Sequence, residues 1–174
     1  MISRCLQKLK PAAPIELRWM LAADADEVLA IERASFAVPW TAEDFTRTLQ
    51  RRDVLSIVSH ICGRVVGFAV YRARRGQIDL WNLAVWPGSR GKGVATTIIE
   101  SLAATTPRLV AEVSERNVEA QVFLRNRGFH YCLTLPSHYE DQDAYVFERL
   151  NLPATPHEED AACCGRKKES VSFP

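Results

Sequence analysis

The sequence predicts an α/β (α+β) domain, because segments with strand composition alternate along the chain with segments of helical periodicity. Branched and aromatic residues fill short runs such as Gln77–Val85, whereas apolar residues recur at helical spacing in runs such as 94–104. The chain has 174 residues, of which 47% are hydrophobic and 25% charged. That composition suits one domain with a sizeable core.

Each predicted element rests on its composition and on the turn residues beside it. Thr41 is placed as the N-cap of the second helix, with Asp44 three residues later. Cys62-Gly-Arg64 is typical of a tight hairpin turn between two strands. In chain order we expect a strand at 15–19, helices at 25–36 and 42–51, strands at 54–61, 65–72 and 77–85, a helix at 94–104, a strand at 108–113, a helix at 118–127, and strands near 129–135 and 144–150.

The two ends of the chain differ from this pattern. From Asn151 onward, prolines and clusters of like charge at 158–160 and 166–168 replace the apolar periodicity, which predicts a disordered tail over 151–174. Residues 1–13 are assigned to an N-terminal extension and 14–150 to the domain. The first ten residues lack the apolar core of a signal peptide, and no segment suits a membrane span, so we expect a cytoplasmic protein.

Charge and cysteine content narrow the classes of partner. The net charge of +1 gives no overall attraction to nucleic acid or to membranes, and we expect neither as a partner. The cysteines are odd in number and show no paired metal-ligand spacing with histidines, which predicts free thiols and no metal. They are Cys5, Cys62, Cys132, Cys163 and Cys164.

A glycine-rich turn at 86–95 joins the strand at 77–85 to the next helix. Gly91 and Gly93 lack a Cβ, so the backbone can adopt unusual conformations and a ligand can approach its N–H groups closely. Those groups, together with the positive end of the helix dipole, favour a pyrophosphate. An ordinary tight corner between a strand and a helix is the alternative.

Two other phosphate-binding patterns fit less well. A P-loop requires Ser or Thr directly after Gly-Lys, but Gly93 follows Lys92. A dinucleotide fingerprint requires a third glycine where Thr96 stands, although Glu112 falls near its acidic position. The residues downstream do not repeat strand–helix units in the doubly wound manner. A nucleotide-binding oxidoreductase therefore stays open only as an alternative.

Five motifs, of which the glycine turn is one, occur in the order found in one superfamily. Arg90-Gly-Lys-Gly-Val-Ala95 matches the Arg/Gln-x-x-Gly-x-Gly/Ala pattern of the GCN5-related N-acetyltransferases (GNAT). The others are Phe36-Ala-Val-Pro-Trp40, Asn82-Leu-Ala-Val85, Glu112-Val-Ser-Glu-Arg-Asn117 and Arg127-Gly-Phe129. Across residues 14–150 the chain resembles the RimI-type ribosomal-protein alanine N-acetyltransferases within that superfamily. The resemblance implies a GNAT fold, with a central mixed, mostly antiparallel sheet of about seven strands flanked by about four helices.

The resemblance also implies acetyl-CoA as cosubstrate. A strand end offers backbone groups that can bond the peptide-like pantetheine, and the glycine turn suits the pyrophosphate. Asn117 is either a further cofactor contact or simply the N-cap of the next helix. The implied cofactor residues are Leu83, Ala84, Val85, Arg90, Gly91, Lys92, Gly93, Val94, Ala95, Thr96 and Asn117.

Acetylation of an amine needs a neutral nucleophile, and an α-amine with a pKa of about 8 needs only a modest base. The counterpart of Glu112 in the RimI-type family is the general base, acting directly or through one water. A solvated edge carboxylate is the alternative.

Leu124 occupies the position of the family's tyrosine, which protonates the departing thiolate. Because a CoA thiol has a pKa of about 8 to 9, the thiolate can leave without that proton.

The segment 137–145 resembles the family's tyrosine-bearing loop. The resemblance implies that Tyr139 is a second catalytic group and clasps the incoming peptide, with His138 as another candidate proton carrier. A surface tyrosine half-packed on the sheet and an exposed loop histidine are the alternatives. Phe36, Trp40 and Tyr139 suggest a partly aromatic slot for a peptide end, and Pro39 is a further predicted substrate-binding residue. The implied acceptor is a protein N-terminal α-amine, with ribosomal protein S18 as candidate. A non-catalytic acyl-CoA sensor, a small-molecule amine and a lysine side chain are the alternatives.

Overall fold

The computed structural model describes residues 14–139 and 142–151. The predicted extension, 1–13, lies outside the described residues, and so does the predicted tail, 151–174, apart from Asn151. Asn151 itself is tied to the domain, because its N–H donates to the Pro107 carbonyl at 2.7 Å. The elements are β1 (Glu16–Trp19), η1 (Ala22–Asp24), α1 (Ala25–Ser35), α2 (Ala42–Leu49), β2 (Val54–Ile61), β3 (Arg64–Arg74), β4 (Gln77–Val85), η2 (Pro87–Ser89), α3 (Val94–Ala103), β5 (Arg108–Ser114), α4 (Val118–Arg125), β6 (His130–Tyr139) and β7 (Gln142–Leu150).

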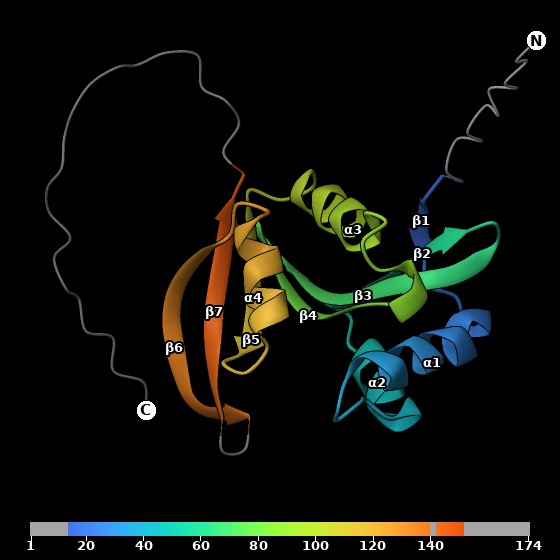
Figure 1. Cartoon of the computed structure of the whole chain (residues 1–174), viewed down its shortest axis with the longest axis horizontal. Helices are drawn as coiled ribbons and strands as arrows, with labels where there is room; N and C mark the ends of the chain where they lie inside the picture. Colours follow the sequence, from blue (N-terminus) through green and yellow to red (C-terminus); the bar gives the residue numbers. More distant parts are fainter. Residues whose placement is uncertain (1–13, 140–141, 152–174) are drawn as a thin grey trace, which may run out of the picture.

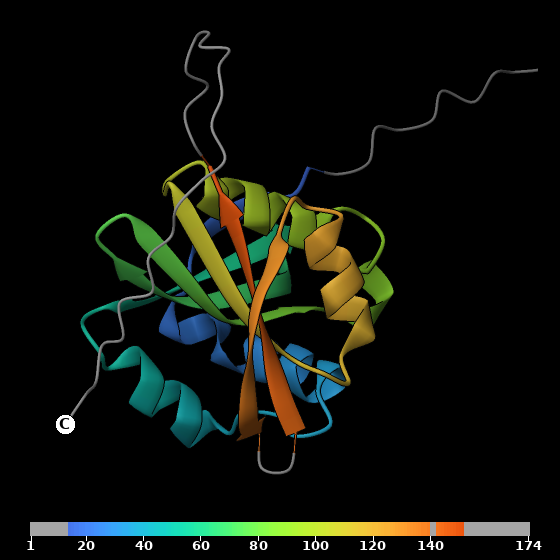
Figure 2. The same cartoon turned by 90° about the vertical axis from the view of Figure 1, so that its left-hand side faces the viewer.

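The seven described strands form one sheet in the order β1-β2-β3-β4-β5-β7-β6. Neighbouring strands are antiparallel except for β4 and β5, which are parallel. Helices α1 and α2 lie on one face of the sheet, and α3 and α4 lie on the other (Figures 1 and 2). The mixed, mostly antiparallel sheet that the resemblance implied is thus confirmed.

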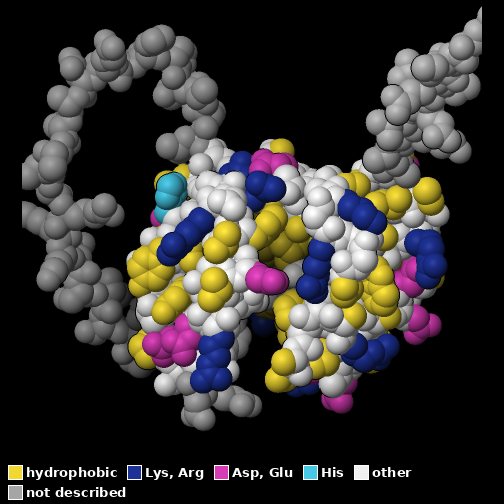
Figure 3. Space-filling model, in the orientation of Figure 1, with side chains coloured by type: hydrophobic (Ala, Val, Ile, Leu, Met, Phe, Trp, Pro, Cys, Tyr) yellow, Lys and Arg dark blue, Asp and Glu magenta, His cyan; other side chains and the backbone are white. Residues whose placement is uncertain are grey.

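The sheet divides between its two parallel strands. β4 and β5 pair only from Ile78 with Leu109 to Leu80 with Ala111. Beyond that point β4 stays paired with β3 as far as Val85, and β5 stays paired with β7 as far as Ser114. We call the gap between 81–85 and 112–114 the sheet opening. Figure 3 shows a hollow in the middle of this face, between the surface over α4 and the surface over η2 and the start of α3.

Local sequence explains the turns that place these elements. Cys62 and Gly63 both have positive φ, 51° and 78°, as a two-residue hairpin turn requires, so the predicted turn between β2 and β3 is confirmed. The Thr41 hydroxyl accepts the Asp44 N–H at 3.1 Å, and the Asp44 carboxylate accepts the Thr41 N–H at 2.9 Å. The predicted N-cap of α2 is therefore confirmed as a reciprocal capping box.

Two hydrophobic clusters fill the two sides of the sheet. Ile98, Ile99 and Leu102 of α3 are buried in the cluster that also contains Leu124 and Phe147. The second cluster joins α1 and α2 to β2 and β3, and its buried members are Val28, Ile31, Phe45, Val54, Val58, Val65, Phe68, Val70 and Ala84. β4 supplies residues to both clusters, so its position relative to the helices on either face is fixed by packing.

One boundary differs from the prediction. The strand expected to end at 135 continues to Tyr139, and the expected loop at 137–145 is mostly strand. A register shift between Leu135 and Tyr139 makes this continuation feasible. Ser137 takes a positive φ of 52°, and its N–H donates to Asp143 Oδ1 at 3.0 Å. No helix in the described ranges has both the length and the apolar surface to span a bilayer.

Candidate active site

The glycine turn ends in a helix that has no capping side chain. Gly91 and Gly93 have φ values of 73° and 88°, and Gly93 is the N-cap of α3. A side chain at either residue would meet no tight contact. Glycine is therefore favoured here by the positive φ and not by a lack of space. Because glycine offers no side-chain acceptor, the first N–H groups of α3 are left for water or for an anion.

The charged side chains of the turn fold back onto the protein. Arg90 Nε donates to the Val85 carbonyl and Arg90 Nη2 donates to Ser35 Oγ, both at 3.3 Å. Lys92 Nζ donates to the Gly88 carbonyl at 2.8 Å. Arg90 therefore fixes the turn against the end of α1. Within this arrangement, the main chain at 91–96 is the part of the turn best suited to an anion.

An arginine that the sequence reasoning did not assign orders the start of α3. Arg127 donates from Nε and Nη2 to Thr96 Oγ1 at 3.0 and 2.7 Å, and its guanidinium carbon lies 5.4 Å from the ring centre of Phe123. The Thr96 side chain is thus held by a residue of the turn that follows α4. Asn117 caps α4, because its Oδ1 accepts the Ala120 N–H at 3.1 Å. The cap explains Asn117 without a ligand, and its cofactor role stays a prediction.

Leu83, Ala84 and Val85 lie in β4 along the sheet opening. They pair with Ala69, Phe68 and Gly67 of β3, while β5 no longer pairs with this part of β4. Ala84 and Val85 are buried and Leu83 is partly buried. The backbone edge of β4 that faces the opening is consequently available to a ligand that bonds like a strand.

Glu112 directly follows Ala111, the last residue of β5 that pairs with β4, so it lies where the sheet opening begins. Its Oε2 is 3.1 Å from Nε2 of His138, and the two side chains are 44% and 40% exposed. The irregular end of β6 explains this contact, since the positive φ of Ser137 precedes His138 directly. The structure therefore joins two predicted proton-handling groups from separate strands.

Two other predicted positions are placed differently. Leu124, at the family's tyrosine position, is 3% exposed and belongs to the core under α4. Leucine there is a packing residue and cannot donate a proton. Tyr139 ends β6 and pairs with Gln142, but its side chain lies outside the described part of the structure. Its catalytic and peptide-binding roles stay predictions.

The aromatic residues predicted for the acceptor lie in the connection between α1 and α2. Phe36 and Trp40 are partly buried against the second cluster, and the Trp40 ring meets Phe45 edge-on at 5.3 Å. Pro39 is partly buried, whereas Val38 between them is 89% exposed. The connection and the hairpin end of β6 and β7 lie at the same end of the molecule (Figures 1 and 2).

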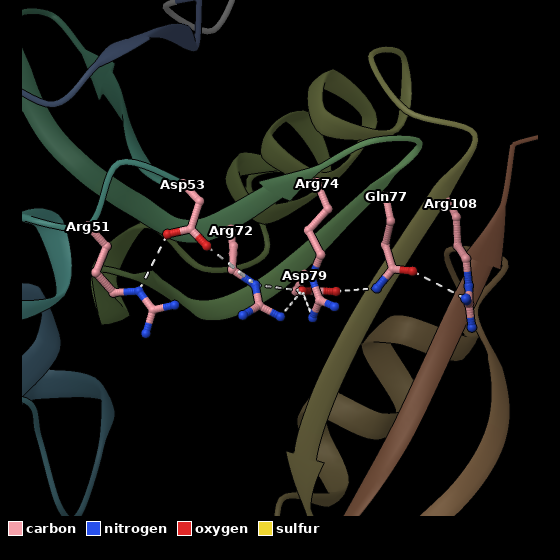
Figure 4. Close-up of polar contacts among 7 residues, drawn as sticks. All are labelled: Arg51, Asp53, Arg72, Arg74, Gln77, Asp79 and Arg108. Atoms are coloured by element: carbon pink, nitrogen blue, oxygen red, sulfur yellow. Dashed lines mark hydrogen bonds and ion pairs between the residues drawn. The ribbon is translucent and has the colours of Figure 1, made fainter. Parts of the chain in front are cut away.

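A polar row crosses the opposite, closed end of the β4–β5 pair (Figure 4). Asp79 is buried and accepts Arg72 Nη2 at 3.0 Å, with Arg74 and Gln77 as further partners. Arg108 Nη1 of β5 donates to Gln77 Oε1 of β4 at 3.2 Å. Side-chain contacts thus support the strand pairing where it exists, so the opening begins from a fixed end.

Comparison with known proteins identifies the class. The profile of the acetyltransferase (GNAT) family matches residues 25–129. An uncharacterized N-acetyltransferase of Methanocaldococcus jannaschii is 31% identical over 130 residues, which cover 71% of this chain and 83% of that protein. The fold resembles the ribosomal-protein-S18-alanine N-acetyltransferase from Escherichia coli, with a TM-score of 0.73 and 20% identity over 84% of this chain and 100% of that one. Ard1 from Thermoplasma volcanium gives 0.72 and 24%, over 80% and 99%.

The fold, the glycine turn and these relatives define an N-acetyltransferase. The chain belongs to the GNAT family, whose enzymes use acetyl-CoA. The predicted superfamily and enzyme class are confirmed.

Proposed function

We propose that this enzyme transfers the acetyl group of acetyl-CoA to the N-terminal α-amine of a protein. The sheet opening carries the proposal. It leaves the backbone of 81–85 without a strand neighbour on one side and begins beside Glu112 on the other. A thioester bound along β4 would therefore have a carboxylate across the opening from it.

On the donor side of the sheet opening lie β4, the glycine turn and α3, residues 77–103. The uncapped start of α3 and the positive φ of Gly91 and Gly93 suit a diphosphate held by main-chain N–H groups. The predicted cofactor residues from Leu83 to Val85 and from Arg90 to Thr96 fit this use, and Asn117 lies at the start of α4. Acetyl-CoA supplies a thioester carbonyl that is open to attack by an amine.

The acceptor side comprises Glu112, His138 and the connection at 36–41. Glu112 accepts a proton from the amine, directly or through one water, as the nitrogen forms its bond to the carbonyl carbon. The carbon–sulfur bond breaks and the thiolate leaves, taking its proton from solvent. His138 holds the carboxylate from β6 at 3.1 Å. This arrangement needs no tyrosine at position 124.

The proposed acceptor class rests on the position of the α1–α2 connection. The connection and the adjoining ends of β6 and β7 lie at one end of the molecule (Figures 1 and 2). We expect a chain terminus to enter at this end, with Trp40 and Tyr139 as its predicted contacts. The similar Escherichia coli enzyme acts on an alanine of ribosomal protein S18. The S18 N-terminus is therefore a candidate acceptor for this chain as well.

The test is an acetyl-CoA assay read by mass spectrometry. The panel contains peptides with different first residues, including the S18 N-terminus, and matched peptides with a blocked N-terminus and an internal lysine. A polyamine provides a small-molecule arm. We expect acetylation of free α-amines alone. Acetylation of the blocked lysine peptides or of the polyamine, with the free α-amines unmodified, would contradict the proposed acceptor class.

A further inference from the structure

α1 carries a carboxylate that the proposed chemistry does not use. Glu32 is 1% exposed, and among the described residues its partners are two hydrogen-bond donors rather than a cation. Its Oε1 accepts the Trp40 N–H at 2.8 Å, and its Oε2 accepts Asn82 Nδ2 at 3.1 Å. Burial raises the pKa of this carboxyl group, and the two hydrogen bonds oppose that rise. Burying a carboxylate without a paired cation costs folding free energy, which suggests that the two contacts of Glu32 have a function.

The two hydrogen bonds join the acceptor side to the donor side. Trp40 belongs to the α1–α2 connection, whereas Asn82 belongs to β4, two residues beyond the last pair with β5. Asn82 is 7% exposed and stands directly before Leu83 on the edge of the sheet opening. Glu32 is thus bonded at once to the main chain of the acceptor connection and to the strand proposed to lie along pantetheine.

Side-chain packing alone does not fix the main chain of this connection at Trp40, where the N–H donates to Glu32. The Trp40 ring rests on Phe45, and Phe36 packs on the same cluster, but Val38 between them is exposed. Packing of two rings tolerates small shifts of the backbone, whereas a hydrogen bond of 2.8 Å fixes the Trp40 N–H itself. An apolar side chain at 32 could fill the same space without desolvating a charge.

We propose that Glu32 is a positioning residue for acetyl transfer: by bonding Trp40 N–H and Asn82 together, it sets the distance between the acceptor connection and the donor strand. The proposal rests on the proposed function for the identity of the acceptor. Its structural part, the fixing of the Trp40 main chain by Glu32, does not depend on it.

Two near-isosteric variants separate hydrogen bonding from charge and from volume. In Glu32→Gln, the amide oxygen still accepts from Trp40, and the NH2 group can donate to Asn82 Oδ1 after the Asn82 amide turns over. That oxygen is buried and has no hydrogen-bond partner among the described residues. Glu32→Met fills similar space and accepts neither bond. We expect KM for the peptide to rise about tenfold in Glu32→Met, equivalent to one such bond, and to change less than about twofold in Glu32→Gln.

Asp24 provides a matched control at the other end of α1. It is also buried, but it is bonded to Arg18 at 2.6 and 2.7 Å, away from the connection. Asp24→Asn should lower the melting temperature without changing KM for the peptide. In Glu32→Gln, Glu32→Met and Asp24→Asn, the Kd of acetyl-CoA should stay within about twofold of the wild-type value. A KM that rises equally in Asp24→Asn and Glu32→Met would reduce the effect to stability and overturn the proposal.

Hydrogen exchange gives a readout that does not require activity. In the unchanged protein and in Glu32→Gln, the segment 36–41 should exchange slowly at Trp40, and in Glu32→Met that protection should be lost. If Glu32→Met does not fold, Asn82→Ala is the substitute, because it removes one of the two hydrogen-bond partners of Glu32. It should raise KM for the peptide, with a smaller increase in exchange at the Trp40 N–H than Glu32→Met would give. Equal exchange in all variants, or loss of protection in Glu32→Gln, would overturn the proposal. Should the unchanged protein acetylate no peptide, the proposed function fails while the exchange result still decides the role of Glu32.

Discussion

The donor side and the acceptor side of the sheet opening are built in different ways. The donor side is one continuous stretch from β4 through the glycine turn to α3, and backbone conformation at Gly91 and Gly93 shapes it. The acceptor side draws Glu112, His138 and the α1–α2 connection from segments far apart in the chain, and side-chain contacts hold them. A change on the donor side should therefore alter cofactor affinity, and a change on the acceptor side should alter turnover or acceptor affinity.

Glu112→Gln should give the largest effect. The amide keeps the shape of the side chain but cannot accept the amine proton, so kcat should fall by about 10² to 10⁴. The Kd of acetyl-CoA should stay unchanged, because Glu112 lies on the acceptor side. Steady-state kinetics and isothermal titration calorimetry measure the two quantities. Unchanged turnover would remove Glu112 from the chemistry.

Gly93→Ala should weaken acetyl-CoA binding by about tenfold, since a side chain at positive φ costs about 1 to 2 kcal/mol and distorts the turn. Gly63→Ala is the matched control: Gly63 has a φ of 78°, close to the 88° of Gly93, and lies in the β2–β3 hairpin. Calorimetric unfolding should show similar destabilisation in both variants. Equal loss of cofactor affinity in both would contradict the assignment of the turn to the diphosphate.

His138→Gln should have a smaller effect on kcat. The contact with Glu112 is exposed, and exposed pairs contribute about 0.2 to 1 kcal/mol, so the loss should be less than about fivefold. The rate should fall while the Kd of acetyl-CoA stays the same. A loss as large as that in Glu112→Gln would instead make His138 the principal proton acceptor.

The smallest effects concern the dependence of stability on pH at the two ends of α1. The hydrogen bond from Arg18 holds the pKa of Asp24 below 3.8, so Asp24 favours folding above that pH, and the contribution is lost as pH falls through the folded pKa. Burial raises the pKa of Glu32 above 4.5, so stability due to Glu32 falls as pH rises from that value through the folded pKa.

Thermal unfolding as a function of pH checks these two signs. Asp24→Asn should lower the melting temperature by a few degrees near neutral pH, and the loss should shrink as the buffer becomes more acidic than the ordinary Asp pKa. Glu32→Gln should gain stability relative to the unchanged protein as pH rises above about 4.5. The same direction of change in both variants would contradict the contrast between a carboxylate bonded to a cation and one without a cation.

The difference between the donor side and the acceptor side also explains what the sequence could predict. The Thr41 cap, the Cys62-Gly63 hairpin and the glycine turn depend on neighbouring residues, and all three are found where residue chemistry placed them. The order of helices and strands along the chain follows from the same local patterns together with the family resemblance. These features need no knowledge of distant contacts.

The acceptor side was less accessible because its contacts are non-local. Ser137 takes a positive φ without being glycine, so nothing in its neighbourhood predicts that His138 reaches Glu112. Glu32 follows the buried Ile31 and lies four residues after Val28, which are spacings on the inner face of α1. An acid at such a position is the signal that could have drawn attention to it. Its partner Asn82, fifty residues away, could come only from the folded structure.

The most direct test of the central claim is a crystal structure with a conjugate that joins CoA to a peptide N-terminus through an acetyl bridge. We predict that the diphosphate lies within hydrogen-bond distance of main-chain N–H groups in 91–96 and that pantetheine runs along 81–85. The peptide nitrogen should lie within one water of Glu112, with the connection at 36–41 beside the peptide. A diphosphate bound away from the turn, or a peptide that enters from the side of α3, would contradict the account.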